Sequence, residues 1–84
     1  MGELYIKAKI EKGSIYSERI AYVADIGGSV REFFAHKSQT GLDSVCVSEI
    51  LRKGNQVLVE LPREASDGSW RLWVDRSQIV SGLN

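Results

Sequence analysis

Hydrophobic and polar residues alternate along much of this 84-residue chain, and a period of two is typical of half-buried β-strands. The clearest run covers residues 4–11, where aliphatic residues occupy every second position and tyrosine or charged residues lie between them. Residues 19–26 are apolar on both faces, which indicates a more central strand. Gly27-Gly28-Ser29 then predicts a tight hairpin turn, because glycine adopts positive φ freely, and residues 30–36 return as the partner strand.

The second half of the chain continues this pattern. Residues 56–62 have the alternation of a strand, and Pro62 marks its end because proline cannot donate to a β-ladder. A hairpin loop over residues 65–69 leads to the last strand, residues 69–75. Residues 76–80 predict one tight helical turn, followed by a frayed tail.

Residues 43–54 allow two interpretations. An acidic residue at their start and a glycine at their end, with two cations just before it, would suit a short helix. Val45 and Val47 favour a strand, because β-branched side chains are stiff in helices and these two share one face of a strand. We therefore expect a strand to about Ile50, followed by a turn over residues 52–55.

One phrase of the sequence occurs twice. The segment Phe33–Gln39 returns as Leu72–Gln78, 39 positions further along. In each copy two large apolar residues and a small or β-branched one lead, through one polar residue, to a basic residue and then Ser-Gln. Each copy also follows a turn rich in glycine and serine. The repetition predicts two similar β-hairpins that end in the same exit turn and close on one another.

Six short strands without a convincing helix predict an all-β protein, a small antiparallel barrel of about six strands. The run Val57–Leu61, the strand Trp70–Val74 and the segment Arg76–Val80 resemble the closing half of an SH3-like barrel, in which a helical turn joins the last strands. The resemblance covers roughly the last third of the chain. The aromatic-and-proline pattern of SH3 peptide-binding grooves is absent, so polyproline recognition is not implied.

Length and charge limit the possible functions. One domain over residues 1–84 buries only about 60–65% of its unfolded surface, which leaves little room for a deep pocket. Eleven Lys and Arg residues balance eleven Asp and Glu residues, so the electropositive footprint of most nucleic-acid binders is missing. A protein without net charge also self-associates more readily, because its copies repel one another less.

The sequence also bears on the compartment. A charge follows too soon after the N-terminus for a signal peptide, and no apolar run approaches the roughly 20 residues of a membrane span. The lone Cys46 cannot form an internal disulfide or a cysteine-based zinc site. We therefore expect a cytoplasmic protein that does not contact a membrane.

The last strand predicts one core face and one outward face. Trp70, Leu72 and Val74 share the apolar face, so we expect all three in the core. Trp73 lies between two charged residues and would project outward, and Phe34 occupies the matching position in the first copy of the phrase. Two outward aromatic rings could form one patch, and such patches mark binding surfaces. Alternatively, a loop or a terminus covers Trp73.

These observations favour a non-enzymatic interaction module. The predicted contact surface centres on Phe34 and Trp73, with Arg71, Lys37 and Arg76 at its rim, and its partner is another protein or a second copy in a homodimer. The alternative is weak binding of single-stranded nucleic acid, in which bases stack on the same aromatic rings.

Other chemistry has little support in the sequence. His36 could be combined with Ser38 and Asp75 into a triad, but no strained nucleophile elbow or oxyanion hole accompanies them. Ser38 and Ser77 occupy the same position in the two copies, which favours a local structural role at the exit turn instead. Gly27-Gly28-Ser29 is too short for a phosphate-binding loop and precedes no helix. We expect no catalytic residue, no cofactor, no metal and no small-molecule substrate.

Overall fold

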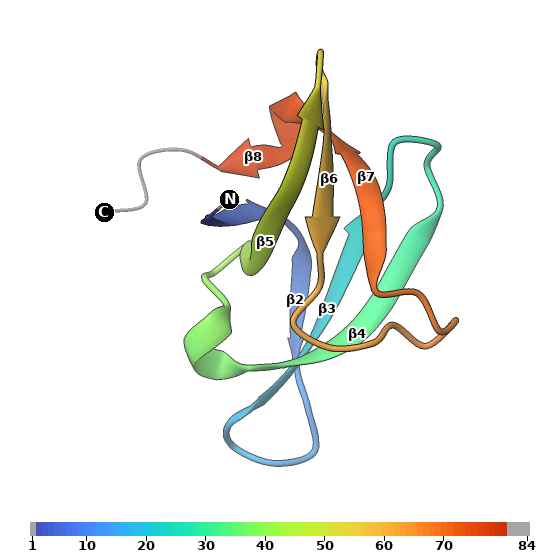
Figure 1. The fold of residues 1–84 in the computed structure, drawn as a ribbon. Helices are drawn as coiled ribbons and strands as arrows, with labels where there is room; N and C mark the ends of the chain where they lie inside the picture. Colours follow the sequence, from blue (N-terminus) through green and yellow to red (C-terminus); the bar gives the residue numbers. More distant parts are fainter. Residues whose placement is uncertain (1, 81–84) are drawn as a thin grey trace.

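The computed structural model describes residues 2–80, which form strands and two short 3-10 turns (Figure 1). The strands are β1 (Glu3–Lys7), β2 (Lys9–Lys12), β3 (Glu18–Ala24), β4 (Val30–His36), β5 (Ser44–Lys53), β6 (Gln56–Glu60), β7 (Arg71–Asp75) and β8 (Ile79–Val80), and the 3-10 turns are η1 (Lys37–Gln39) and η2 (Arg76–Gln78). The prediction of an all-β protein is confirmed, since the only helices among the described residues are these turns.

The strands form two antiparallel sheets and not the closed barrel that the sequence led us to expect. One sheet has the order β7-β6-β5-β1-β8 and the other has the order β2-β3-β4. Figure 1 shows the β5–β6–β7 part of the first sheet lying in front of the second. No ladder joins β4 to β7 within residues 2–80; two backbone hydrogen bonds cross there instead, from Ile26 N–H to Trp73 O and from Ser66 N–H to Glu32 O, both 2.8 Å.

The expected first strand is divided at Ala8. Its N–H donates to the carbonyl of Asp43 at 3.0 Å instead of to a strand partner. The chain therefore leaves the larger sheet after β1 and enters the smaller one as β2, so that one continuous segment contributes to both layers.

The core lies between the two sheets and consists of the inward residues of nearly every strand. Period-two alternation places these residues on one face of each strand. The buried hydrophobic cluster is Ile6, Ala21, Val23, Phe33, Ala35, Val45, Val47, Val57, Val59, Leu61, Ala65, Leu72 and Val74.

The β3–β4 and β6–β7 hairpins contain the same five-residue turn, at residues 25–29 and 65–69. In each turn the first N–H donates to the fifth carbonyl at 2.8 Å, and the fourth N–H donates to the first carbonyl. The fourth residue is glycine in both, Gly28 with φ 91° and Gly68 with φ 89°. A left-handed residue at this point is typical of a hairpin turn that closes with a bulge.

The Ser-Gln exit turns also have one geometry. His36 (φ −80°, ψ 147°) precedes η1 and Asp75 (φ −78°, ψ 146°) precedes η2. Each of these side chains accepts the N–H of the serine two residues later, while Gln39 and Gln78 accept the N–H of His36 and Asp75, both at 2.8 Å. This reciprocal pair of bonds is a capping box. The repeated phrase therefore encodes the same turn twice.

Several strand boundaries differ from the predictions, besides the division of the first strand. The strand interpretation of residues 43–54 is confirmed, but β5 continues to Lys53 and contains a bulge between Glu49 and Leu51. The predicted helical turn over residues 76–80 ends at Gln78, because Ile79 and Val80 pair with β1. The predicted frayed tail lies outside the described residues.

Candidate interaction face

Of the two tryptophans, Trp73 lies on the outward face that the alternation of the last strand predicts, and Trp70 does not lie in the core. Leu72 and Val74 are buried as expected, but Trp70 is 49% exposed, so its assignment to the core is wrong. The reason is that β7 begins only at Arg71, and Trp70 belongs to the end of the preceding loop. Trp73 is half-buried and faces outward from β7.

Phe34 and Trp73 lie on different sheets. Phe34 is 49% exposed on the outer face of the three-stranded sheet, where it is opposite Ile20 of β3. Trp73 lies on the outer face of the five-stranded sheet, where it is opposite Leu58 of β6. Each ring therefore has its own hydrophobic neighbours, and the structure does not combine the two rings as the sequence suggested.

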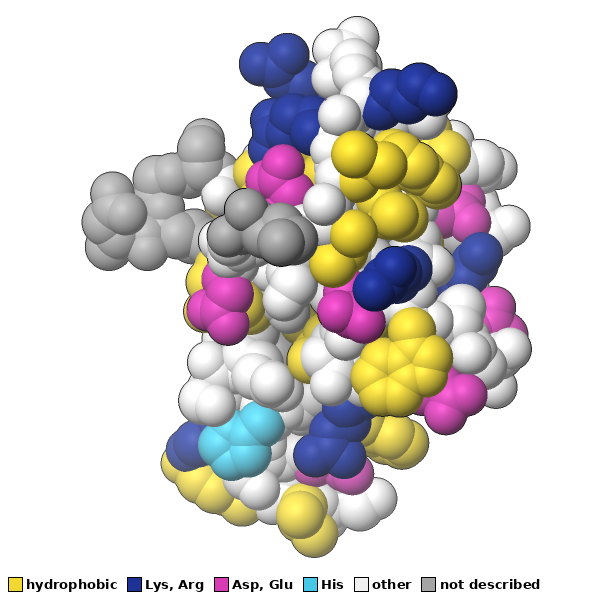
Figure 2. Space-filling view, viewed as in Figure 1, with side chains coloured by type: hydrophobic (Ala, Val, Ile, Leu, Met, Phe, Trp, Pro, Cys, Tyr) yellow, Lys and Arg dark blue, Asp and Glu magenta, His cyan; other side chains and the backbone are white. Residues whose placement is uncertain are grey.

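The outer face of β5, β6 and β7 has three rows of side chains, and its middle row is hydrophobic. Cross-strand pairing places Leu51 opposite Leu58, and Leu58 opposite Trp73. Figure 2 shows hydrophobic side chains gathered over the upper part of these strands, with Lys and Arg at the borders. We call Leu51, Leu58 and Trp73 the hydrophobic row.

Polar rows flank the hydrophobic row on both sides, in the register of the same strand pairs. The row nearer the β5–β6 turn is Lys53, Gln56 and Asp75, and the row on the other side is Ser48, Glu60 and Arg71. A hydrophobic centre bordered by polar side chains is the usual composition of a protein interface.

The bulge in β5 brings Leu51 to this face. With regular alternation from Ser48, the outward residue would be Ile50. The bulge inserts one extra residue, so Leu51 pairs with Leu58 and is 50% exposed. Sequence reasoning missed Leu51 for this reason. Leu58 carries no signal in the sequence, because alternation assigns Val57 and Val59 to the core face and leaves Leu58 as a single apolar residue on the polar face of that strand.

Three of the five predicted contact residues lie together. Trp73 and Arg71 share the outer face of β7, and Arg76 follows that strand in η2. Arg71 Nε lies 3.6 Å from Glu60 Oε2, which is a loose and exposed ion pair. Lys37 lies elsewhere, in η1, with its ammonium 3.8 Å from the centre of the exposed Tyr16 ring.

The residues considered for a triad act as two separate caps. His36 Nδ1 accepts the Ser38 N–H at 3.0 Å and lies 2.7 Å from Ser38 Oγ. Asp75 accepts the N–H of Ser77 in the other exit turn, and hydrogen bonds from the Ser77 side chain and backbone hold the pKa of Asp75 below its usual value. Each side chain thus stabilises its own turn. In residues 2–80 no three His, Cys, Asp or Glu side chains lie close enough to hold a metal ion.

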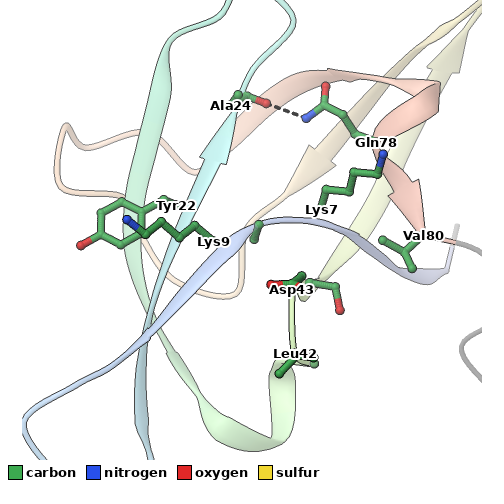
Figure 3. Close-up of a pocket in the computed structure, with 11 residues that line it drawn as sticks. Lys7, Lys9, Tyr22, Ala24, Leu42, Asp43, Gln78 and Val80 are labelled. Atoms are coloured by element: carbon green, nitrogen blue, oxygen red, sulfur yellow. Dashed lines mark hydrogen bonds between the residues drawn. The ribbon is translucent and has the colours of Figure 1, made fainter.

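A shallow groove lies where the chain passes from one sheet to the other. It has a volume of about 840 Å³ and is lined by residues of the β1–β2 junction, β3, the β4–β5 connector and the β8 region. Figure 3 shows Gln78 reaching Ala24 at one end, where its Nε2 donates to the carbonyl at 2.7 Å. The Lys9 ammonium lies 5.8 Å from the centre of the Tyr22 ring, and Leu42 at the rim is 91% exposed.

Comparison with known proteins found no match to this chain among family models, curated proteins or solved structures. Within residues 2–80 no helix has the length and hydrophobicity needed to cross a bilayer.

Proposed function

We propose that this protein is a non-enzymatic interaction module that binds a protein partner through the outer face of β5, β6 and β7. The hydrophobic row is the observation that supports this proposal. Leu51, Leu58 and Trp73 are adjacent in three consecutive strands. Removal of their apolar surface from water by a partner would be favourable. Tryptophan is also the residue most enriched among the side chains that dominate binding energy at interfaces.

The surroundings of the row favour a protein over nucleic acid. Arg71 is near Glu60, and Asp75 lies beside Arg76, so both signs of charge alternate around the row. Binding to a phosphate backbone favours a continuous positive groove. Mixed charges around an apolar centre are suited to a protein surface of complementary pattern. Phe34 and Lys37 lie outside this face, and we assign them no part in it.

We extend the proposal to the fold and the compartment. The continuous β1–β2 segment that joins both sheets, and the η2 turn between β7 and β8, support an open relative of the SH3-like barrel. We also place the module in the cytoplasm, where the single Cys46 would stay reduced.

Site-specific photo-cross-linking in the native cell tests the proposal. A photoreactive amino acid replaces Gln56, which borders the hydrophobic row between Lys53 and Asp75. Lys12, exposed on β2 of the other sheet, is the control position. We expect covalent protein adducts from position 56 that disappear when Trp73→Ser is added. Absence of adducts, or the same adducts from position 12, would contradict the proposal.

A further inference from the structure

We propose that the partner is a second copy of this chain, packed face to face about a two-fold axis that runs along the hydrophobic row. This inference rests on the proposed function, because it uses the same face and specifies its occupant. With this axis each residue of the row meets its own counterpart, so that Leu51, Leu58 and Trp73 bury one another. An isologous contact of this kind requires a self-complementary surface.

The charges of the face are complementary about this axis. The two-fold exchanges the polar rows, so the row of Lys53, Gln56 and Asp75 packs on the row of Ser48, Glu60 and Arg71 of the other copy. Asp75 then meets Arg71 of the other copy, and Gln56 meets Glu60. Symmetry forms the Asp75–Arg71 pair twice. Every residue of the two rows therefore faces an oppositely charged or uncharged neighbour.

The other simple two-fold axis, parallel to the strands through β6, is less favourable. It leaves the middle strand opposite itself and exchanges β5 with β7. Lys53 would meet Asp75, but Glu60 would meet Glu60 of the other copy on the axis. Opposed like charges in an interface are unfavourable. The charge pattern therefore selects the axis along the row.

The size of the face implies a weak dimer. Strands lie about 4.8 Å apart and alternate residues about 6.8 Å apart, so nine side chains in three strands cover roughly 300 Å². A stable interface buries about 800 Å² on each partner. We therefore expect a transient dimer with a Kd of roughly 0.1–1 mM, which is populated where local concentration is high.

Sedimentation equilibrium up to about 1 mM tests the dimer. Arg71→Glu places one carboxylate against Asp75 of the other copy and, by symmetry, does so twice in the dimer, so it should weaken association roughly tenfold. Lys12→Glu makes the same charge change on β2 of the other sheet and should leave association unchanged. A strictly monomeric wild type would overturn the inference, and so would equal effects of the two variants.

Cross-linking tests the axis in a Cys46→Ser background, with a short bis-methanethiosulfonate linker. Leu51→Cys should be joined to its counterpart efficiently, and Gln56→Cys should not, because Gln56 faces Glu60 of the other copy. The opposite result would establish the axis parallel to the strands and overturn the packing described here. If neither variant is joined, the two faces do not meet.

These results separate the inference from the proposed function. A cross-linked adduct that forms from position 56 and has twice the mass of the chain supports a second copy as the partner. Adducts with a different protein, together with a monomer in the centrifuge, keep the interaction face and overturn self-association. Absence of any specific adduct overturns the interaction face itself.

Discussion

The two exit turns contain equivalent glutamines, Gln39 and Gln78, so substitution of one serves as the control for substitution of the other. Gln39 and Gln78 both close a capping box by accepting the N–H of the residue before the turn, each at 2.8 Å. Within residues 2–80 only Gln78 makes a second side-chain bond, in which its Nε2 donates to Ala24 O at 2.7 Å and links η2 to the last residue of β3. Replacement of either glutamine by alanine should therefore remove a different number of hydrogen bonds.

The expected magnitudes follow from that count. A net hydrogen bond contributes about 0.5–1.5 kcal/mol, and the lower part of that range applies here because these bonds are accessible to water. Gln39→Ala should cost about 0.5–1 kcal/mol of the free energy of unfolding, and Gln78→Ala about 1–2 kcal/mol. For a domain of this size, 1 kcal/mol corresponds to about 4–8 °C, so the Tm of Gln78→Ala should lie roughly 2–8 °C below that of Gln39→Ala.

Thermal and urea unfolding, followed by circular dichroism, measure both variants under the same conditions. The slope of the free energy against urea should be unchanged, because neither substitution alters the surface exposed on unfolding. Equal losses of stability in the two variants would refute the reasoning, since the Gln78–Ala24 bond would then contribute nothing. A larger loss for Gln39→Ala would refute it as well.

Four further outcomes are expected. His36→Asp should raise the Tm, because aspartate is the better N-cap and already serves in the other turn; a lower Tm would contradict this. The lowered pKa of Asp75 contributes stability above about pH 4 that is lost as the pH falls further. The free energy of unfolding of Asp75→Asn should therefore decrease less below pH 4 than that of the wild type, and an equal decrease would contradict this. Burial, and secondarily the Glu3 carboxylate, raises the pKa of the Cys46 thiol. Glu3→Gln should therefore increase the thiolate fraction and speed alkylation of Cys46 at pH 8, and an unchanged rate would show that the carboxylate does not affect the thiol. Oligonucleotides at low salt should leave tryptophan fluorescence unchanged, and quenching that fades with added salt would instead support nucleic-acid binding.

The elements that depend on neighbouring residues were predictable from the sequence. Strand β4 occupies Val30–His36 as predicted, because its alternation and the glycines before it act within a few residues. The two exit turns likewise adopt one geometry, because each capping box spans four consecutive residues. Leu72 and Val74 were correctly placed in the core for the same reason, since alternation within one strand is a local property.

Features that depend on pairing between strands could not be derived in this way. Ala8 breaks the first strand because its N–H bonds to Asp43, 35 positions away, and no local signal marks that break. The bulge before Leu51 changes which residues of β5 face outward, and the alternation gives no sign of it.

Local order in this chain thus follows from its alternation, its turn glycines and its Ser-Gln phrases, each of which acts over a few bonds. The candidate face has a different origin. Leu51, Leu58 and Trp73 come from three strands, and they are adjacent only because the register of two ladders and one bulge align them. Register is set by long-range packing of the two sheets, so the hydrophobic row exists only in the folded protein.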